Sequence, residues 1–210
     1  MISMRIIKLC IFFFSLNMLA QNTPLNNSEK QAFKASVVEK SNDIESFSAD
    51  FSQIKHMKMM EGSSESQGKV YYKSPNTLKW EYIKPYDYQL LFKDSKLFIL
   101  EEGQLSEVDL SSNKLFDKMG ELVAGSVNGK ILMADKDFDI TYHHADSNVK
   151  ALIIPKDENL RGMFKEIWIN FNQEHIIRSV KLIDPSGDYT EISMKNIKIN
   201  QPIPSSVFQN

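Results

Sequence analysis

The strongest constraint on the fold is a two-residue period of apolar side chains that recurs along most of the chain. From Thr77 to Tyr82, the apolar residues Leu78, Trp80 and Tyr82 alternate with polar ones. Successive side chains of a strand point to opposite faces of a sheet, so this period predicts a strand with one buried and one hydrated face. A chain made largely of such segments is expected to fold as β-structure.

The same period, interrupted by turn residues, predicts an antiparallel sheet or barrel. The run from Glu61 to Gln67 is rich in Gly, Ser and Glu, and is predicted to be a flexible turn. Apart from one helix predicted over residues 114–123, no helix is predicted between neighbouring strands, and their spacing of about 8 to 12 residues is typical of antiparallel folds. The predicted strands are 46–52, 68–73, 77–82, 88–92, 96–100, 105–110, 137–143, 149–154, 165–171, 176–183 and 188–197.

Two segments have helical periodicity instead. Ser28 and, three residues later, Gln31 predict a capping box for a helix that reaches about Lys40. A second helix is predicted over residues 114–123. The apolar face of the first helix is Ala32, Phe33, Val37 and Val38, and that of the second includes Leu115, Phe116, Met119, Leu122 and Val123.

The N-terminus has the three parts of a cleavable secretory signal. A positive start and an apolar stretch from Leu9 to Leu16 precede a short exit at Ala20. The apolar stretch is shorter than the roughly 20 residues that a membrane-spanning helix needs. We therefore expect export, cleavage after Ala20, and one mature domain over residues 21–210, since about 190 residues suit a single large β domain.

Cysteine and charge exclude several classes of protein. Cys10, the single cysteine, lies inside the signal and lacks the small preceding residue that lipid modification requires, so the mature domain must be stable without disulfides. The chain has 25 basic and 27 acidic residues, and Arg5 and Lys8 leave with the signal. A mildly acidic domain of this kind favours neither nucleic acid nor an anionic membrane surface as a partner.

No motif predicts catalysis, a cofactor or a metal. His143 and His144 are adjacent, so on a strand they point to opposite faces and cannot bind one ion together. The acidic residues from Asp135 to Asp139 imitate a calcium loop, but Ile140 stands where its sharp turn requires glycine. No nucleophile elbow or phosphate loop occurs. We expect a binding protein, not an enzyme.

The remaining unusual feature is one strongly apolar and aromatic sheet face. Periodicity alone favours a plain sandwich core built from this face. A single curved sheet around two helices would instead leave an apolar hollow able to hold acyl chains. Methionines such as Met57, Met59 and Met133 would suit an adaptable lining.

Short motifs between Ile44 and Pro85 resemble a known family. The segment IESFSADFSQ at 44–53 is followed by GKVYYK at 68–73 and PNTLKWEY at 75–82. Their order and spacing resemble the periplasmic outer-membrane lipoprotein carrier of the Lol system, the LolA family.

The resemblance implies an unclosed β-barrel, made of a single curved antiparallel sheet covered by two or three short helices that enclose an apolar cavity. It also implies a monomeric periplasmic carrier for acylated lipoproteins. Such a carrier would receive cargo from an ATP-driven release complex of the inner membrane and deliver it to an outer-membrane acceptor. Acyl chains need a cover because each exposed CH₂ costs about 0.8 kcal/mol in water.

The resemblance also assigns roles to residues. Leu78 and Trp80 match the family's cavity residue and its tryptophan, and Phe47 and Phe51 match its two phenylalanines. Ser74 stands where the family often has an arginine that binds the lid. The expected cavity residues are Phe47, Ala49, Phe51, Val70, Leu78, Trp80, Tyr82, Leu90, Phe92, Phe138, Ile140 and Tyr142. The expected lid residues are Phe33, Val37, Leu115, Phe116 and Met119.

Two other functions stay open. A periplasmic sensor or acceptor module of the same fold would bind acyl or glycolipid chains and stay with one partner. A hydrolase of envelope lipids would need a nucleophile and a base that the sequence does not provide. If Leu78 lines a hydrated hollow, Leu78→Glu is expected to weaken acyl binding more than folding.

Overall fold

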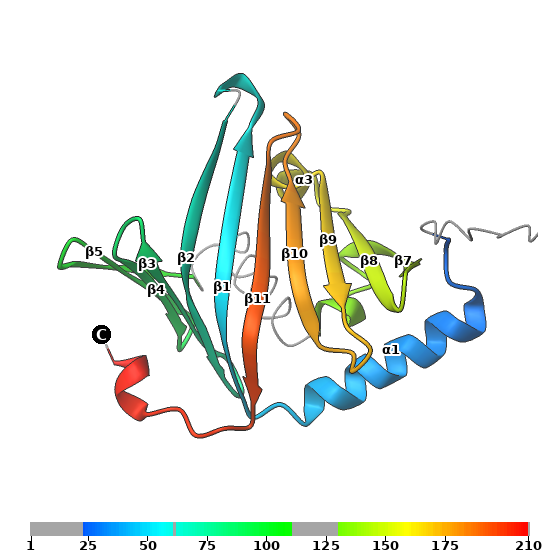
Figure 1. Cartoon of the computed structure of the whole chain (residues 1–210), viewed down its shortest axis with the longest axis horizontal. Coiled ribbons are helices and arrows are strands. Elements are labelled where there is room, and N and C mark those ends of the chain that lie inside the picture. Colours follow the sequence, from blue (N-terminus) through cyan, green and yellow to red (C-terminus); the bar gives the residue numbers. More distant parts are fainter. Residues whose placement is uncertain (1–22, 61, 111–129, 210) are drawn as a thin grey trace, which may run out of the picture.

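A computed structural model of the chain describes residues 23–60, 62–110 and 130–209. The signal segment and the predicted helix over 114–123 lie outside these residues. The described strands form one 11-stranded sheet in the order β6-β5-β4-β3-β2-β1-β11-β10-β9-β8-β7 (Figure 1). Every neighbouring pair is antiparallel. The predicted antiparallel sheet is confirmed.

The sheet is built from two meanders that meet at its centre. The first contains β1 (Ser46–Met57), β2 (Gly62–Lys73), β3 (Thr77–Lys84), β4 (Tyr88–Lys93), β5 (Lys96–Glu101) and β6 (Gln104–Asp109). The second contains β7 (Phe138–Ala145), β8 (Asn148–Pro155), β9 (Glu166–Phe171), β10 (Ile177–Ile183) and β11 (Tyr189–Ile199). The first and last strands, β1 and β11, pair antiparallel and join the two meanders.

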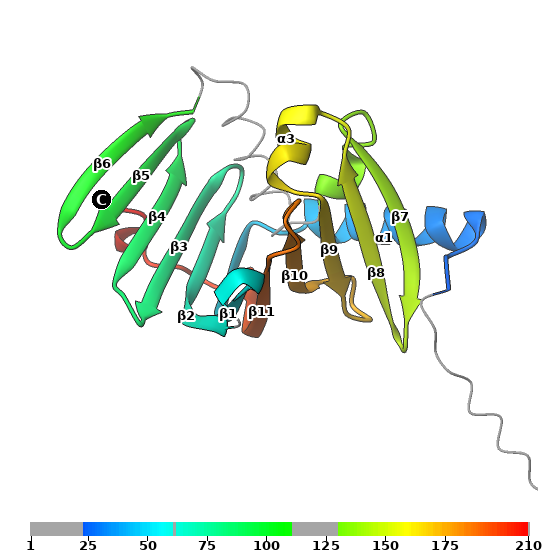
Figure 2. The same cartoon turned by 90° about the horizontal axis from the view of Figure 1, so that it is seen from above.

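Seen from above, the sheet curves around an open side, with the edge strands β6 and β7 far apart (Figure 2). One continuous sheet that is curved and not closed excludes a sandwich of two sheets. The expectation of an unclosed barrel is therefore confirmed, and the sandwich favoured by periodicity alone is wrong. Alternation could not distinguish them because both architectures need strands with one buried face.

The predicted flexible turn over 61–67 is wrong, because β2 already begins at Gly62. In the hairpin that β1 and β2 form, His56 lies opposite Ser63. Both faces of the hairpin are exposed to solvent near its tip, so residues 62–67 have the polar composition of a loop. The turn is a single 3₁₀ turn, η1 (Lys58–Met60), where the Lys58 backbone N–H donates to Asp188 Oδ1 at 2.9 Å.

The first helix, α1 (Asn27–Asn42), confirms the predicted helix but begins with a different capping box. The Glu29 backbone N–H donates to Asn26 Oδ1 at 3.0 Å, and the Asn26 N–H donates to Glu29 Oε2 at 2.8 Å. Asn26 takes the place of the predicted Ser28 because, two residues earlier, its side chain accepts from one of the free N–H groups of the first turn. Phe33 and Val37 are buried as predicted, whereas Ala32 is exposed and Val38 is half-buried.

Two short helical elements complete the cover of the second meander. η2 (Lys130–Met133) precedes β7, and α3 (Glu158–Met163) connects β8 to β9. The prediction of no helix between strands is wrong at α3, whose six residues bury only Leu160 and therefore carry little periodic signal. Asp157 Oδ1 caps its first turn. Of the helices in the described part of the chain, none combines the length and apolarity that crossing a membrane demands.

The C-terminal segment packs on the outer, convex face of the first meander. It ends in a 3₁₀ turn, η3 (Ser205–Phe208), which contacts β3 and buries Phe208. On the same face, Lys79 and Leu91 are directly opposite each other on β3 and β4, and both are buried. Lys79 was predicted to face water. A segment distant in sequence covers it, so the local alternation could not show its burial.

The edge strand β7 is protected by the chain that precedes α1. The Leu25 N–H donates to the Tyr142 carbonyl oxygen at 2.9 Å, and the His144 N–H donates to the Thr23 carbonyl oxygen at 2.8 Å. These bonds satisfy part of an edge that would otherwise attract a foreign strand. They also fix the start of the described chain beside β7.

Candidate functional site

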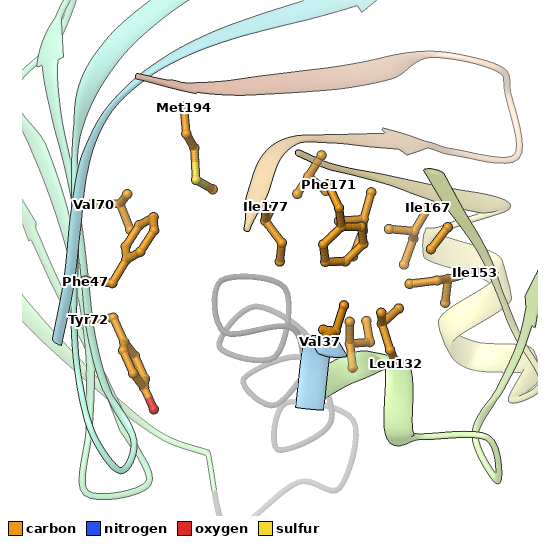
Figure 3. Packing of buried hydrophobic residues seen from close by; sticks show 14 of the residues in the cluster. Val37, Phe47, Val70, Tyr72, Leu132, Ile153, Ile167, Phe171, Ile177 and Met194 are labelled. Carbon is orange, nitrogen blue, oxygen red and sulfur yellow. The ribbon is translucent and has the colours of Figure 1, made fainter. Parts of the chain in front are cut away.

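The inner face of the second meander is a filled core. Ile153, Ile167 and Ile169 on β8 and β9 have no exposed surface. Val37 of α1 and Leu132 of η2 face these strands, as Figure 3 shows for the labelled residues. Among the described residues, side chains of α1 and η2 pack against this half of the inner face and bury it.

Three predicted cavity residues lie in this filled half. Phe138, Ile140 and Tyr142 point inward from β7 and are buried, as their alternation predicted. The ring of Tyr142 lies 5.6 Å from that of Phe33 on α1, and Phe33 also lies 5.3 Å from Phe171. The structure therefore brings these residues together with α1, at a distance in the sheet from the predicted residues of β1 to β4.

The centre of the inner face is also closed. Phe47, Val70 and Leu78 come from β1, β2 and β3, and Leu78 has 0% exposed surface. A residue in contact with a hydrated hollow would retain accessible surface, so the premise for a mild effect of Leu78→Glu is wrong. Leu78 acts as a packed core residue in this conformation, and its role in acyl binding stays a prediction.

An aromatic cluster forms where β2 has no side chain. Gly68 lies opposite Phe51 on β1 and Tyr82 on β3. In the space above this glycine, the Phe51 ring lies 4.7 Å from Trp80 and 5.2 Å from Tyr82, centroid to centroid. The Tyr82 ring lies 5.8 Å from Tyr88 on β4. The cluster thus runs from the buried centre of the sheet towards its rim.

Burial decreases from β3 to β4 and β5. Leu90 and Phe92 pair with Trp80 and Leu78 across the strands and share the inner face, but both are only half-buried. Leu97 and Ile99 of β5 pair with Phe92 and Leu90 and are also half-buried. The sequence prediction missed these two because β5 is apolar on both faces, so alternation could not assign its inner side. Part of the apolar inner surface of β4 and β5 is therefore accessible to a ligand.

A cleft lies at the rim of this half-buried surface. It has a volume of about 360 Å³. Tyr86 projects from the turn between β3 and β4 and is 77% exposed. The lining residues are Ser66, Tyr82, Lys84, Pro85, Tyr86, Tyr88 and Glu101.

Burial and neighbouring groups raise the pKa of two tyrosines of the cleft. Burial, with a smaller contribution from Tyr88, raises the pKa of Tyr82. Burial, together with the charge of Glu101 directly opposite on β5, raises the pKa of Tyr88. The Tyr82 hydroxyl donates a hydrogen bond to Gln53 Oε1 at 3.0 Å. Phenols of this kind can both donate and accept hydrogen bonds at neutral pH.

Two buried donors lie along the inner face without a well-directed partner among the described residues. They are the Trp80 Nε1–H and the Tyr142 hydroxyl. Trp80 lies close enough to the Tyr82 hydroxyl to lower the pKa of Tyr82, an effect smaller than that of burial. A buried donor without a full hydrogen bond costs free energy, which a ligand oxygen could recover.

Met59 is 98% exposed at the tip of the β1–β2 hairpin, and Met133 is also exposed, so the prediction that these methionines line a hollow is wrong. Phe33 and Val37 of the expected lid pack in the filled core, whereas residues 115, 116 and 119 lie outside the described residues. Within residues 23–60, 62–110 and 130–209, no three His, Cys, Asp or Glu side chains gather where they could hold a metal ion.

Fold and site together define a class: an open, curved antiparallel sheet with an apolar inner face and an aromatic cleft at its rim, an arrangement suited to binding an apolar ligand. The model of the family described as outer membrane lipoprotein carrier protein LolA matches residues 42–210. The chain belongs to this family.

Curated relatives agree with this assignment. The outer-membrane lipoprotein carrier protein of Pseudomonas putida KT2440 is 26% identical over 173 residues, which cover 82% of this chain and 79% of that protein. The protein of the same name from Legionella pneumophila strain Corby is 25% identical over 170 residues, which cover 81% of each chain. Both names describe carriers.

Solved structures share the fold at low identity. The Mycobacterium tuberculosis lipoprotein LppX matches with a TM-score of 0.51 and 10% identity, over 85% of this chain and 99% of that one. The Pseudomonas aeruginosa MucA/MucB complex matches with a TM-score of 0.51 and 8% identity, over 85% of this chain and 61% of that one. These likenesses concern the fold alone.

Proposed function

We propose that this protein is a periplasmic carrier that binds the acyl chains of lipoproteins on its apolar inner face and transports them from the inner to the outer membrane. Membership of a family of lipoprotein carriers supports the class of function. The observation that carries the proposal is the half-buried apolar surface of β4 and β5, next to a closed core on one side and an open cleft on the other.

The physical reason is a conflict between holding and releasing lipid. A carrier must cover many CH₂ groups, each worth about 0.8 kcal/mol when buried, and must still transfer them to an acceptor. Leu90, Phe92, Leu97 and Ile99 offer apolar surface that is only partly satisfied by the protein itself. Acyl chains would complete its burial, and a better-matched acceptor would remove them.

The proposed partners follow from this role. Acylated lipoproteins are the cargo, an ATP-driven complex of the inner membrane would release them, and an acceptor at the outer membrane would receive them. The expected export signal over residues 1–20 would place the mature chain between the two membranes. A sensor that stays bound to one partner would need the same inner face. Transfer of cargo to an acceptor distinguishes the carrier from the sensor, because only the carrier releases its ligand.

Charge on the inner face is expected to weaken acyl binding without loss of folding. We expect Leu90→Glu to lower the affinity for a dansylated undecanoic acid by about tenfold or more, because a carboxylate would have to be desolvated against the chain. Fluorescence titration of the purified protein measures the affinity.

The matched control is Leu105→Glu. Leu105 pairs with Leu100 on the outer face and is 53% exposed, so the same change there is expected to leave the affinity unchanged. Equal loss of affinity in both variants, or no binding by the wild type, would refute acyl binding on the inner face.

A further inference from the structure

We propose that the rim cleft is a subsite for a hydroxyl-rich headgroup, such as a glyceryl or sugar unit, attached to an acyl chain. The inference rests on the acyl binding of the proposed function and adds a further ligand class, a single-chain lipid with free hydroxyls, since the hydroxyls of a diacylated glyceryl unit are esterified. Its ligand class is set by the side chains that line the cleft and by their place at the end of the aromatic cluster.

Position connects the cleft to the acyl-binding surface. Tyr82 belongs to both the aromatic cluster and the cleft. Tyr88, beside it on β4, lies two residues before Leu90, so both side chains are on the inner face. A chain that lies along Leu90 and Phe92 therefore ends at the cleft when it runs towards the turn between β3 and β4. The headgroup of that chain would enter the cleft.

The lining suits a ring or short polyol. Tyrosine rings offer flat apolar faces on which the C–H groups of such a molecule can pack, and their hydroxyls donate and accept hydrogen bonds. Tyr82, Tyr86 and Tyr88 provide three such rings, and Ser66 adds another hydroxyl. The volume of about 360 Å³ is at the lower end of the range for small-molecule sites and accommodates a headgroup.

Charge favours a neutral headgroup over an ionic one. Lys84 and Glu101 are the two charged residues of the lining, and their charges cancel. Both are exposed, so solvent screens them and each adds little to binding. The half-buried phenols of Tyr82 and Tyr88 are the stronger partners because water competes with them less. A phosphate or a free cation would find no net attraction.

The test compares two ligands with the same chain. Octyl β-glucoside and octanol, both below their aggregation limits, are titrated against the bound dansylated undecanoic acid. We expect the wild type to bind the glucoside about tenfold more tightly than octanol, the equivalent of one or two good hydrogen bonds. Tyr86→Ala and Tyr88→Phe should each reduce this ratio several-fold and leave octanol binding unchanged.

Controls separate the subsite from folding. Tyr86 is exposed, so its truncation leaves the core intact, and Tyr189→Phe on β11 removes a hydroxyl outside the cleft and should not change the ratio. Equal affinity for the glucoside and octanol, or tighter binding of octylphosphocholine than of the glucoside, would overturn the subsite while acyl binding stands. If neither ligand displaces the dansylated acid and the acid itself does not bind, the proposed function fails instead.

Discussion

Replacing Gly68 by alanine is expected to destabilise the protein by about 3 kcal/mol and to disrupt the aromatic cluster. A Cβ atom at this position would lie 1.9 Å from the Glu81 carbonyl oxygen and 2.7 Å from the Phe51 ring. The carbonyl belongs to the backbone of β3, so the methyl group can be accommodated only if β2 and β3 separate or Phe51 leaves its place. Urea denaturation monitored by circular dichroism measures the change.

Gly162 in α3 provides the matched control. A Cβ atom there would meet nothing within 4 Å, and the residue lies inside a helix. Gly162→Ala is therefore expected to be neutral or to stabilise the protein by up to about 1 kcal/mol, because alanine loses less backbone entropy in a helix. If both variants had the same stability, close approach of the backbone at Gly68 would not explain the cluster.

Leu78→Glu is expected to prevent stable folding. Leu78 is completely buried at the centre of the inner face, so the change removes a packed aliphatic side chain and leaves a carboxylate without water or a partner. Each effect costs several kcal/mol, and together they approach the total stability of a typical domain, about 5 to 15 kcal/mol. The soluble yield and the unfolding midpoint in urea report the outcome.

Two further variants separate the effect of lost packing from the effect of the introduced charge. Leu78→Met keeps the volume and is expected to cost less than about 1.5 kcal/mol. Leu90→Glu places the same charge one strand away on the half-buried surface, where it should reduce acyl binding more than stability. A folded Leu78→Glu protein that has merely lost acyl binding would show that Leu78 faces an open hollow after all.

The sequence predicted strands such as β1, β7 and β9 well because one face of each is buried and the other is not. Leu78 and Trp80, or Ile140 and Tyr142, alternate with polar residues, and the structure places them inward. The same reasoning failed for 62–67, because a hairpin tip with two wet faces has no apolar period. It also failed for α3, which is too short to display one.

Long-range pairing could not be predicted from local pattern. The pairing of β1 with β11 joins the two meanders into a single sheet. The local pattern of either strand does not specify its partner. Burial of Lys79 on the outer face depends on the C-terminal segment, and the edge of β7 depends on Thr23 and Leu25. Of these contacts, the pairing of β1 with β11 places the described strands in one open sheet instead of two packed sheets.

The candidate site was predicted in part. The expected residues on β1, β2 and β3 lie on the inner face, and so do Leu90 and Phe92 of β4. Leu97, Ile99 and the tyrosines of the rim were missed, apart from Tyr82. Tyr86 lies in the turn before β4, Tyr88 begins that strand, and neither belongs to a clear alternation, so only the folded arrangement reveals that they form one cleft with Glu101.

Capture of cargo in the cell tests the central claim most directly. A photoreactive benzoylphenylalanine replaces Leu90 on the inner face or, as a control, Leu105 on the outer face. After irradiation, covalent adducts are isolated and the captured proteins are examined for N-terminal acyl chains. Acylated lipoproteins captured from position 90 and not from position 105, and lost when the lipidated cysteine of a cargo is replaced, are the predicted result. Equal capture at both positions, or adducts without acyl chains, would contradict carriage of lipoproteins on the inner face.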